Sequence, residues 1–278
     1  MGGWLEAIIL GIVQGLTEFL PISSSAHIRI VSTLFGTGTD PGAAFTAILQ
    51  LGTETAVLIY FLPDIVHIVT SWVKALFGRI PRNDPNARLG WFIIIGSIPI
   101  VVLGLLFQKA IETTFRSLWI VATTLIVFGI LLGIADVLGR RSRRLRDMTV
   151  PHAVFFGLAQ SLALVPGVSR SGATIALGRT LGYERPAAAR YSFLLALPAV
   201  FGSGFYELYD SLKHHSPMVF DGAQTGIATV VAGVVGFGVI AFLMRYISKG
   251  SFIPFVVYRV VIGVVIIVLL VTGVLKAQ

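Results

Sequence analysis

The stretch of sequence that decides the fold reads Pro166-Gly167-Val168-Ser169-Arg170-Ser171-Gly172-Ala173-Thr174. It lies between two apolar runs, so Arg170 falls where the flanking sequence is too apolar to form a water-exposed surface. A charged side chain inside a membrane is costly and marks a candidate functional site. A guanidinium offers a planar fork of donors that fits phosphate oxygens, and glycines let backbone N–H groups approach an anion. The stretch therefore predicts a broken membrane helix that carries an anion site; a plain Pro-Gly break with an incidental arginine is the alternative.

The composition around this stretch is that of an integral membrane protein. Of the 278 residues, 55% are hydrophobic and only 12% are charged, and the mean hydropathy is +0.89, whereas soluble domains carry roughly 25% charged residues. The chain has no cysteine, which excludes disulfides, thiolate catalysis and thiolate metal sites. Its net charge of +8 is explained by basic cytoplasmic loops, so we expect no nucleic-acid partner.

The apolar runs have the length that membrane helices of about 20 residues require. They cover residues 4–22, 43–62, 91–107, 118–135, 153–168, 191–206, 226–244 and 252–275. The first run is interrupted by Gln14, Glu18 and Pro21, and the fifth ends at the Pro-Gly break. A cluster of five arginines between Arg140 and Arg146 is the best candidate for a midpoint linker. The sequence therefore predicts an all-α integral membrane protein.

The two halves on either side of this linker resemble each other. Segment 11–16 (Gly-Ile-Val-Gln-Gly-Leu) is echoed by 157–162 (Gly-Leu-Ala-Gln-Ser-Leu), and 45–51 is echoed by 191–197, both at an offset of 146 residues. Pro21-x-x-Ser24 matches Pro166-x-x-Ser169 once one residue is dropped. We read an internal duplication in a single membrane domain, 1–278, with repeat 1 over about 1–138, repeat 2 over about 150–278, and a basic cytoplasmic linker at 139–149.

Each half contains one broken run and three full ones. A broken run that enters and leaves on the same side adds no crossing, so each half crosses the membrane three times, and the second half is upside down relative to the first. The sequence therefore predicts two inverted-topology repeats, each a re-entrant helix hairpin plus three transmembrane helices. The two hairpin tips should meet near the middle of the membrane, where only protein or a watery cavity can shelter irregular backbone.

The basic residues test this topology. One face receives fourteen of them: Lys74, Arg79, Arg82, Arg88, Arg140, Arg141, Arg143, Arg144, Arg146, Arg179, Arg185, Arg190, Arg245 and Lys249. The opposite face receives four: Lys109, Arg116, Lys213 and Lys276. Since cytoplasmic loops carry the excess of Lys and Arg, we expect the linker inside the cell and both termini outside.

The first broken run carries its own polar set. Gln14 and Glu18 are four residues apart and share a helix face, and Ser24 and His27 are three apart just past the break. A carboxylate in lipid costs on the order of 3 kcal/mol, so Glu18 should face a polar cavity or a cation. With Arg170 opposite, the set suits phosphoryl transfer: an anion clamp, a nucleophile or water, and an acid or base. Each residue alone has a plainer explanation, namely a paired carboxylate, an interface histidine or a helix-capping serine.

These motifs also resemble those of a known family. Gln14-x-x-x-Glu18, Pro21-x-Ser-Ser24-x-x-His27, Pro166-Gly-x-Ser-Arg-Ser-x-x-Thr174 and the later Ser251-Phe-Ile-Pro254-Phe-x-x-Tyr258-Arg259 are similar to the signatures of the undecaprenyl-diphosphate phosphatases, also called bacitracin-resistance proteins. The resemblance covers essentially the whole chain. It implies removal of the terminal phosphate from a polyprenyl diphosphate lipid, giving the monophosphate carrier for cell-wall synthesis. It further implies a multi-pass protein of the bacterial cell membrane, with its site open to the outer face.

The resemblance also assigns roles to residues. The catalytic positions are Glu18, Ser24, His27 and Arg170, and those around the phosphate are Gln14, Ser23, Ser25, Ser169, Ser171 and Thr174. It implies a divalent cation, Mg²⁺ or Ca²⁺, held by Glu18, with Gln14 as an optional second ligand. Many members have glutamate where this chain has Gln14, and an amide cannot be the general base, so that burden passes to Glu18 and His27. The attacking group is open: Ser24 is the first choice and water the second.

Several alternatives stay open at this level. Inverted repeats with broken helices are also the architecture of secondary transporters, so a flippase for the polyprenyl phosphate lipid is the competing function. A scaffold without chemistry is the third reading, and the buried polar set argues against it. The sequence leaves open the roles of Glu54 and Arg259, and whether the protein forms a homodimer.

Overall fold

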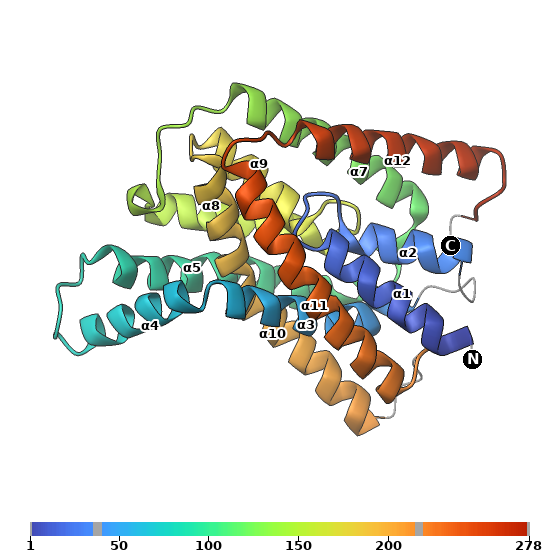
Figure 1. The fold of residues 1–278 in the computed structure, drawn as a ribbon, viewed down its shortest axis with the longest axis horizontal. Helices are drawn as coiled ribbons and strands as arrows, with labels where there is room; N and C mark the ends of the chain where they lie inside the picture. Colours follow the sequence, from blue (N-terminus) through green and yellow to red (C-terminus); the bar gives the residue numbers. More distant parts are fainter. Residues whose placement is uncertain (1, 36–40, 215–218, 277–278) are drawn as a thin grey trace.

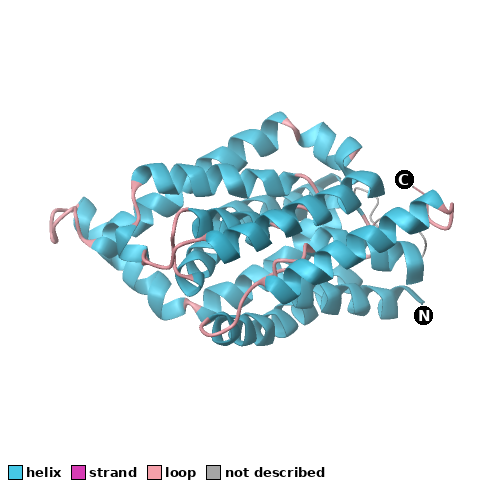
Figure 2. Ribbon diagram, turned by 90° about the horizontal axis from the view of Figure 1, so that it is seen from above, coloured by secondary structure: helices cyan, strands magenta, loops and turns pink. Residues whose placement is uncertain are grey.

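A computed structural model describes residues 2–35, 41–214 and 219–276, and within these ranges every regular element is a helix. The helices of the first half are α1 (Gly2–Thr17), α2 (Ser24–Phe35), α3 (Gly42–Tyr60), α4 (Leu62–Leu76), α5 (Pro85–Leu106), α6 (Gln108–Glu112), η1 (Thr114–Arg116) and α7 (Leu118–Leu138). Those that follow are η2 (Leu145–Asp147), α8 (Val150–Ser161), η3 (Leu162–Leu164), α9 (Arg170–Thr180), α10 (Arg185–His214), α11 (Gly222–Ile247) and α12 (Ile253–Val271). The all-α prediction is confirmed for the described residues (Figures 1 and 2).

Five of these helices, α3, α5, α7, α11 and α12, are long and apolar enough to cross a membrane. The protein is therefore a multi-pass membrane protein. Helix α10, which contains the predicted run 191–206, is 30 residues long but is not among the five. The predicted run 43–62 ends in a break at Phe61, after which α4 continues the chain to Leu76.

Local sequence explains where several helices begin. The Asp84 carboxylate accepts from the backbone N–H groups of Asn86 (2.9 Å) and Ala87 (3.0 Å), satisfying donors that the first turn of α5 leaves free. At the start of α11, Asp221 and Gln224 form a reciprocal capping box. Such caps fix the ends of helices whose middles are uniformly apolar.

Both predicted broken runs fold as helix hairpins. The first hairpin consists of α1 and α2, joined by the non-helical residues 18–23, and the second consists of α8 and α9 with η3 between them. Helix α8 ends at Ser161, before the predicted break at Pro166 and Gly167, because η3 follows directly. The sequence therefore located both interruptions within a few residues.

The helices pair in a pattern that relates the two halves. Helix α1 of the first hairpin packs against α11, and α8 of the second packs against α5. Helix α7 lies beside α12 (Figure 1), and α3 beside α10. Close approach depends on glycine in both hairpins: a side chain on Gly11 would collide with the backbone of Ala228, and one on Gly157 with the backbone of Gly96. Gly157 lies 146 positions after Gly11, so the two hairpins dock in the same way.

The arginine-rich loops meet at one end of the molecule. Arg144 of the linker pairs with Glu184 of the α9–α10 connection (3.2 Å), and nearby helix ends are joined by Arg190 of α10 and Asp64 of α4 (2.6 Å). The buried carboxylate of Asp136, at the end of α7, accepts from Arg179 (3.2 Å) and Arg185 (2.6 and 2.9 Å), and also from the backbone N–H of Phe252 (3.0 Å). Asp136 therefore ties the starts of α10 and α12 to the end of α7.

The chain ends lie together, away from these basic loops. Figures 1 and 2 both show the two termini near one another, with the α4–α5 connection at the far end of the molecule. The main buried core includes Phe19 of the first hairpin tip, with Phe156 and Phe193 on α8 and α10. The hairpin tips are therefore held inside packed protein.

Candidate active site

The tips of the two hairpins contact each other in the middle of the fold. The hydroxyl of Ser171, in the first turn of α9, lies 3.3 Å from the carbonyl oxygen of Leu20 and 3.4 Å from that of Glu18. Residues 18–23 and 165–169 therefore face one another across the interface between the halves.

Arg259 of α12 fastens the two tips together. Its side chain is fully buried, and its Nη1 donates to the carbonyl oxygen of Pro21 (3.1 Å). Its Nη2 donates to the carbonyl oxygens of Gly167 (2.8 Å) and Val168 (3.0 Å), while Nε donates to that of Leu125 on α7 (3.1 Å). The role of Arg259, left open by the sequence, is thus a structural contact to the backbone of both tips.

Each hairpin resumes its helix after a serine with left-handed backbone. Ser23 has φ 74° and Ser169 has φ 69°, and they are the non-glycine residues with positive φ in the described part of the chain. This conformation costs roughly 1–2 kcal/mol and persists where the surroundings enforce it. In both tips the serine hydroxyl lies 3.2 Å from that of the serine two residues on, Ser25 or Ser171. The two tips are therefore built alike.

This geometry changes one detail of the predicted repeat. The sequence comparison paired Ser24 with Ser169 and required one dropped residue. The left-handed backbone instead pairs Ser23 with Ser169, 146 positions apart, which is the offset already found for the flanking segments. No residue needs to be dropped, and Ser24 becomes the counterpart of Arg170, each being the first helical residue after the cap.

Glu18 is the centre of the polar cluster. One carboxylate oxygen, Oε2, accepts from the amide of Gln14 (2.8 Å) and from the hydroxyl of Ser24 (2.5 Å). The other, Oε1, accepts from Nη2 of Arg170 (2.8 Å). A carboxylate that receives a serine hydroxyl is placed to accept its proton when that oxygen attacks an electrophile.

Arg170 connects the two hairpin tips with helix α3. It is the first residue of α9, and its Nη2 donates to Glu18 and also to Oε1 of Glu54 on α3 (2.5 Å). Its Nη1 is buried and has no protein partner, so its donor capacity is unused in this structure. Glu54 is fully buried, and its second oxygen, Oε2, likewise has no partner. A glutamate inside an apolar run was the sequence signal, but its partner lies 116 residues away and could not be read from local spacing.

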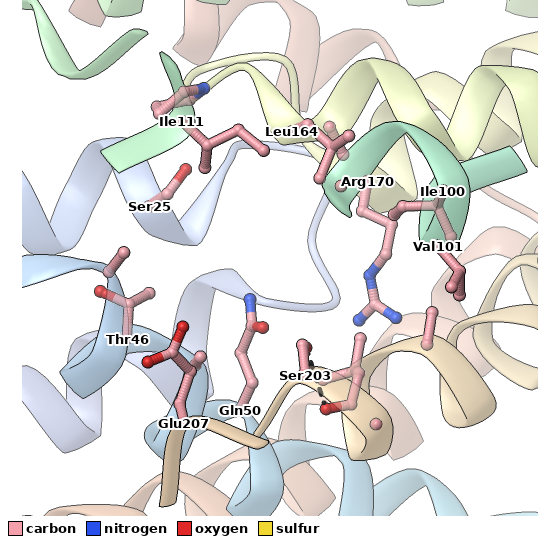
Figure 3. A pocket seen from close by; sticks show the side chains of 18 of the residues that line it. Ser25, Thr46, Gln50, Ile100, Val101, Ile111, Leu164, Arg170, Ser203 and Glu207 are labelled. Carbon is pink, nitrogen blue, oxygen red and sulfur yellow. Dashed lines mark hydrogen bonds between the residues drawn. The ribbon is translucent and has the colours of Figure 1, made fainter. Parts of the chain in front are cut away.

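A cavity of about 490 Å³ opens beside this cluster. Six of the ten predicted site residues line it: Glu18, Ser23, Ser24, Ser25, Ser169 and Arg170. The remaining wall is largely apolar and comes from α5 and α10 as well as η3, for example Val101, Leu164 and Val200. Figure 3 shows the Arg170 guanidinium and the Gln50 amide extending into the same space. The cavity therefore combines a compact anion-binding end with apolar walls.

The other four predicted residues do not line the cavity: Gln14, His27, Ser171 and Thr174. His27 is engaged at both ring nitrogens, because Nδ1 donates to the carbonyl oxygen of Ser23 (2.7 Å) and Nε2 accepts from the hydroxyl of Tyr258 (2.8 Å). The structure therefore places His27 as a contact between the first tip and α12. Thr174 is fully buried against Ser192 of α10, at an oxygen–oxygen distance of 2.5 Å.

The described residues contain no cluster of three or more His, Cys, Asp or Glu side chains that could enclose a metal ion. Two oxygens nevertheless suit a cation that arrives with an anionic ligand. Glu18 supplies a carboxylate at the cavity, and Oε1 of Gln14 is buried without a partner. Mg²⁺ is commonly bound through only one or two carboxylates plus substrate phosphates, so this donor set fits.

Comparisons with known proteins identify the family of the chain. The sequence pattern of the family "Bacitracin resistance protein BacA" matches residues 7–265. The chain is 62% identical over 275 residues to an undecaprenyl-diphosphatase from Micrococcus luteus, covering 99% of both chains. It is 59% identical to one from Renibacterium salmoninarum, covering 99% of this chain and 98% of the relative. It is 54% identical to undecaprenyl-diphosphatase 2 of Agrobacterium fabrum, with coverage of 99% and 98%.

Proposed function

The chain belongs to the bacitracin resistance protein family, and from this membership and the geometry of its site we propose that it hydrolyses undecaprenyl diphosphate. The products are undecaprenyl monophosphate, the carrier lipid for cell-wall synthesis, and inorganic phosphate. The protein is thus a membrane-bound phosphatase that confers resistance to bacitracin. The observation that carries the proposal is the contact of one carboxylate, Glu18, with both Ser24 and Arg170 at the wall of the cavity.

This contact gives each residue a chemical task. Glu18 Oε2 takes the proton of Ser24 as the serine Oγ attacks the terminal phosphorus, and the bond from that phosphorus to the bridging oxygen breaks. The monophosphate lipid leaves, and water then hydrolyses the phosphoserine, releasing phosphate and returning the proton. If water is the attacking group in place of Ser24, Glu18 directs that water at the same phosphorus, and no phosphoserine forms.

Arg170 acts as the clamp on the transferring phosphoryl group. Its Nη1, buried behind the cavity wall without a protein partner, would donate to a phosphate oxygen once the substrate enters, while Nη2 stays with the carboxylates. Ser23, Ser25 and Ser169 line the cavity beside it and add hydroxyl donors. Positioned donors of this kind stabilise the charge that spreads over the equatorial oxygens during transfer.

A divalent cation, Mg²⁺ or Ca²⁺, completes the proposed site. Glu18 and the Oε1 atom of Gln14 would hold it. Bound there, it would relieve the repulsion between the carboxylate and the diphosphate by neutralising phosphate charge.

We propose the inverted repeat for the architecture as well. The first helix of each hairpin packs against a helix of the other half, α1 against α11 and α8 against α5. This reciprocal packing supports two repeats of opposite topology, about 1–138 and 150–278, around a cytoplasmic linker at 139–149. The hairpins α1–α2 and α8–α9 are then re-entrant, and both termini and the site face outward. The clustering of the arginine-rich loops at one end of the molecule supports the same orientation.

The test is release of inorganic phosphate from undecaprenyl diphosphate by the purified protein in detergent, with and without a chelator. We expect turnover that the chelator abolishes and added Mg²⁺ or Ca²⁺ restores. If Ser24 is the attacking group, Ser24→Ala should be nearly inactive. Ser97→Ala should behave as the wild type in either version, because the Ser97 hydroxyl donates to Ile93 within α5, away from the cavity. Detergent abolishes vectorial transport but not hydrolysis, so a wild-type protein that releases no phosphate would favour the flippase function instead.

A further inference from the structure

Glu54 is a fully buried carboxylate on a membrane-spanning helix, α3, and its contact is with the catalytic cluster. Its Oε1 accepts from Nη2 of Arg170 at 2.5 Å, the same nitrogen that donates to Glu18. Three elements far apart in sequence, the first hairpin tip, α3 and α9, therefore converge on one guanidinium. The trio carries two potential negative charges and one positive charge, so it is not a simple ion pair.

A second buried carboxylate in the chain shows what a purely structural role looks like. Asp136 uses both of its oxygens, accepting from Arg179, Arg185 and the backbone N–H of Phe252. Glu54 differs, because Oε2 has no partner although it is fully buried. Buried polar groups are normally satisfied, and those left unsatisfied concentrate where function requires them.

The contact between Glu54 and Arg170 also determines how many hydrogen bonds Glu18 makes to the guanidinium. Arginine and carboxylate groups often pair through two parallel hydrogen bonds, which would occupy both oxygens of Glu18. Here Glu18 gives only Oε1 to Arg170, and its Oε2 stays with Ser24. The second carboxylate on Nη2 holds the guanidinium in this one-bond geometry and leaves Nη1 without a protein partner.

We propose that Glu54 is a positioning residue for phosphoryl transfer: it holds Nη2 of Arg170, keeps Nη1 available for the phosphate, and leaves Glu18 Oε2 to take the proton of Ser24. The inference rests on the proposed function and extends it to a residue of α3. Glu54 does not line the cavity, so it acts through Arg170 and not by touching the substrate.

The experiment compares wild type, Glu54→Gln, Glu54→Asp and Asp136→Asn in detergent. For each protein we would measure kcat and KM for undecaprenyl diphosphate, the inhibition constant of orthovanadate, which mimics the five-coordinate phosphorus of the transition state, and the unfolding temperature. Misplacing a catalytic group costs roughly a hundredfold in rate. Glu54→Gln should therefore lower kcat and the affinity for orthovanadate by about this factor each, with little change in KM.

Glu54→Asp keeps the charge but is one methylene shorter, and we expect a loss of about tenfold in kcat and vanadate affinity. Asp136→Asn is the matched control: its unfolding temperature should fall, while kcat per folded molecule and the vanadate constant stay at wild-type values. A Glu54→Gln protein with wild-type kcat, or with lowered kcat but unchanged vanadate affinity, overturns the positioning role. If Glu54→Gln does not fold, wild-type values for Glu54→Asp overturn it equally. These outcomes can be read only if the wild type is active. An inactive wild type refutes the proposed phosphatase function itself.

Discussion

Arg170 shows how much of the site depends on the shape of one side chain. Its Nη2 bridges Glu18 and Glu54, and its Nη1 is left for the phosphate. A lysine at this position supplies one ammonium in place of a planar fork, so it cannot hold two carboxylates and a phosphate in fixed directions. The function of Arg170 is therefore geometric as well as electrostatic.

We predict that Arg170→Lys and Arg170→Ala are both nearly inactive, by roughly a thousandfold, the scale of arginine contacts in phosphoryl transfer. Turnover at saturating lipid measures this effect, with monodispersity in detergent as the check on folding. A lysine variant that keeps more than about a tenth of wild-type turnover would contradict the clamp, since that loss is far below the expected scale.

His27 is predicted to serve stability more than chemistry. Both ring nitrogens are engaged, by the carbonyl oxygen of Ser23 and the hydroxyl of Tyr258. His27→Asn should therefore lower the free energy of unfolding by about 1–3 kcal/mol. Its kcat should fall by less than tenfold, whereas losing a general acid or base costs about a hundredfold or more. Tyr258→Phe, which removes the Nε2 partner, is the matched variant and should show a smaller version of the same pattern. A hundredfold loss of kcat in a stable His27→Asn protein would return His27 to the acid–base role.

Much of the site was predictable because charged residues, which are energetically costly in a membrane, are easy to recognise within an apolar sequence. Glu18 and Arg170 are charges inside hydrophobic runs, and Ser24 sits at a break beside them. The direction in which His27 points depends on a rotamer and on a partner in α12, neither of which has a local signal. The partner of Glu54 was hidden for the same reason, since no spacing rule relates α3 to α9.

Among the elements, the hairpin tips depend on Arg259. Five backbone carbonyl oxygens accept from this one side chain, from Pro21, Leu125, Thr124, Gly167 and Val168. Buried carbonyls stranded without a donor cost about 1–3 kcal/mol each. The meeting of the two tips, and with it the distance from Glu18 to Arg170, therefore depends on a residue that is not itself in the cavity.

We predict that Arg259→Leu sharply lowers the unfolding temperature in detergent and abolishes phosphate release. Thr124→Val is the matched control at the same place, because it removes one hydroxyl, which lies 2.8 Å from the carbonyl oxygen of Pro166 and otherwise contacts the carbonyl oxygens of Ile120 and Val121 in its own helix. It should cost only about 1 kcal/mol and leave most of the activity. Equal unfolding temperatures for the two variants would show that Arg259 does not hold the tips.

Hydropathy predicted the positions of the helices better than the connections between them. The long apolar runs became helices because a membrane core admits little else. The predicted run 43–62 ended close to the break at Phe61, but helix α4 after it was not predicted, because its polar residues Asp64, His67 and Lys74 keep it outside the apolar runs. The register of the repeat was also missed by one residue in the tips, because it is set by the left-handed backbone of Ser23 and Ser169, which a comparison of residue types does not detect.

At the scale of the whole molecule, orientation is the testable property. The chain contains no cysteine, so single cysteines report without background. Thr113 and Ser142 are both exposed, on the two opposite faces of the proposed topology. In intact cells Thr113→Cys should react with an impermeant thiol reagent, and Ser142→Cys should react only after the membrane is permeabilised. The reverse pattern would overturn the proposed topology.

The equivalence of Ser24 and Arg170 also bears on the ancestry of the chain. At the same offset of 146 residues, Glu18 corresponds to Leu164. On the proposed duplication, two identical half-length ancestors meeting as a symmetric pair would carry the same residue at both members of each such pair. They could not place an acid in one copy and a guanidinium in the other. The difference between the two tips could therefore evolve only after the gene had duplicated, when each copy was free to change on its own.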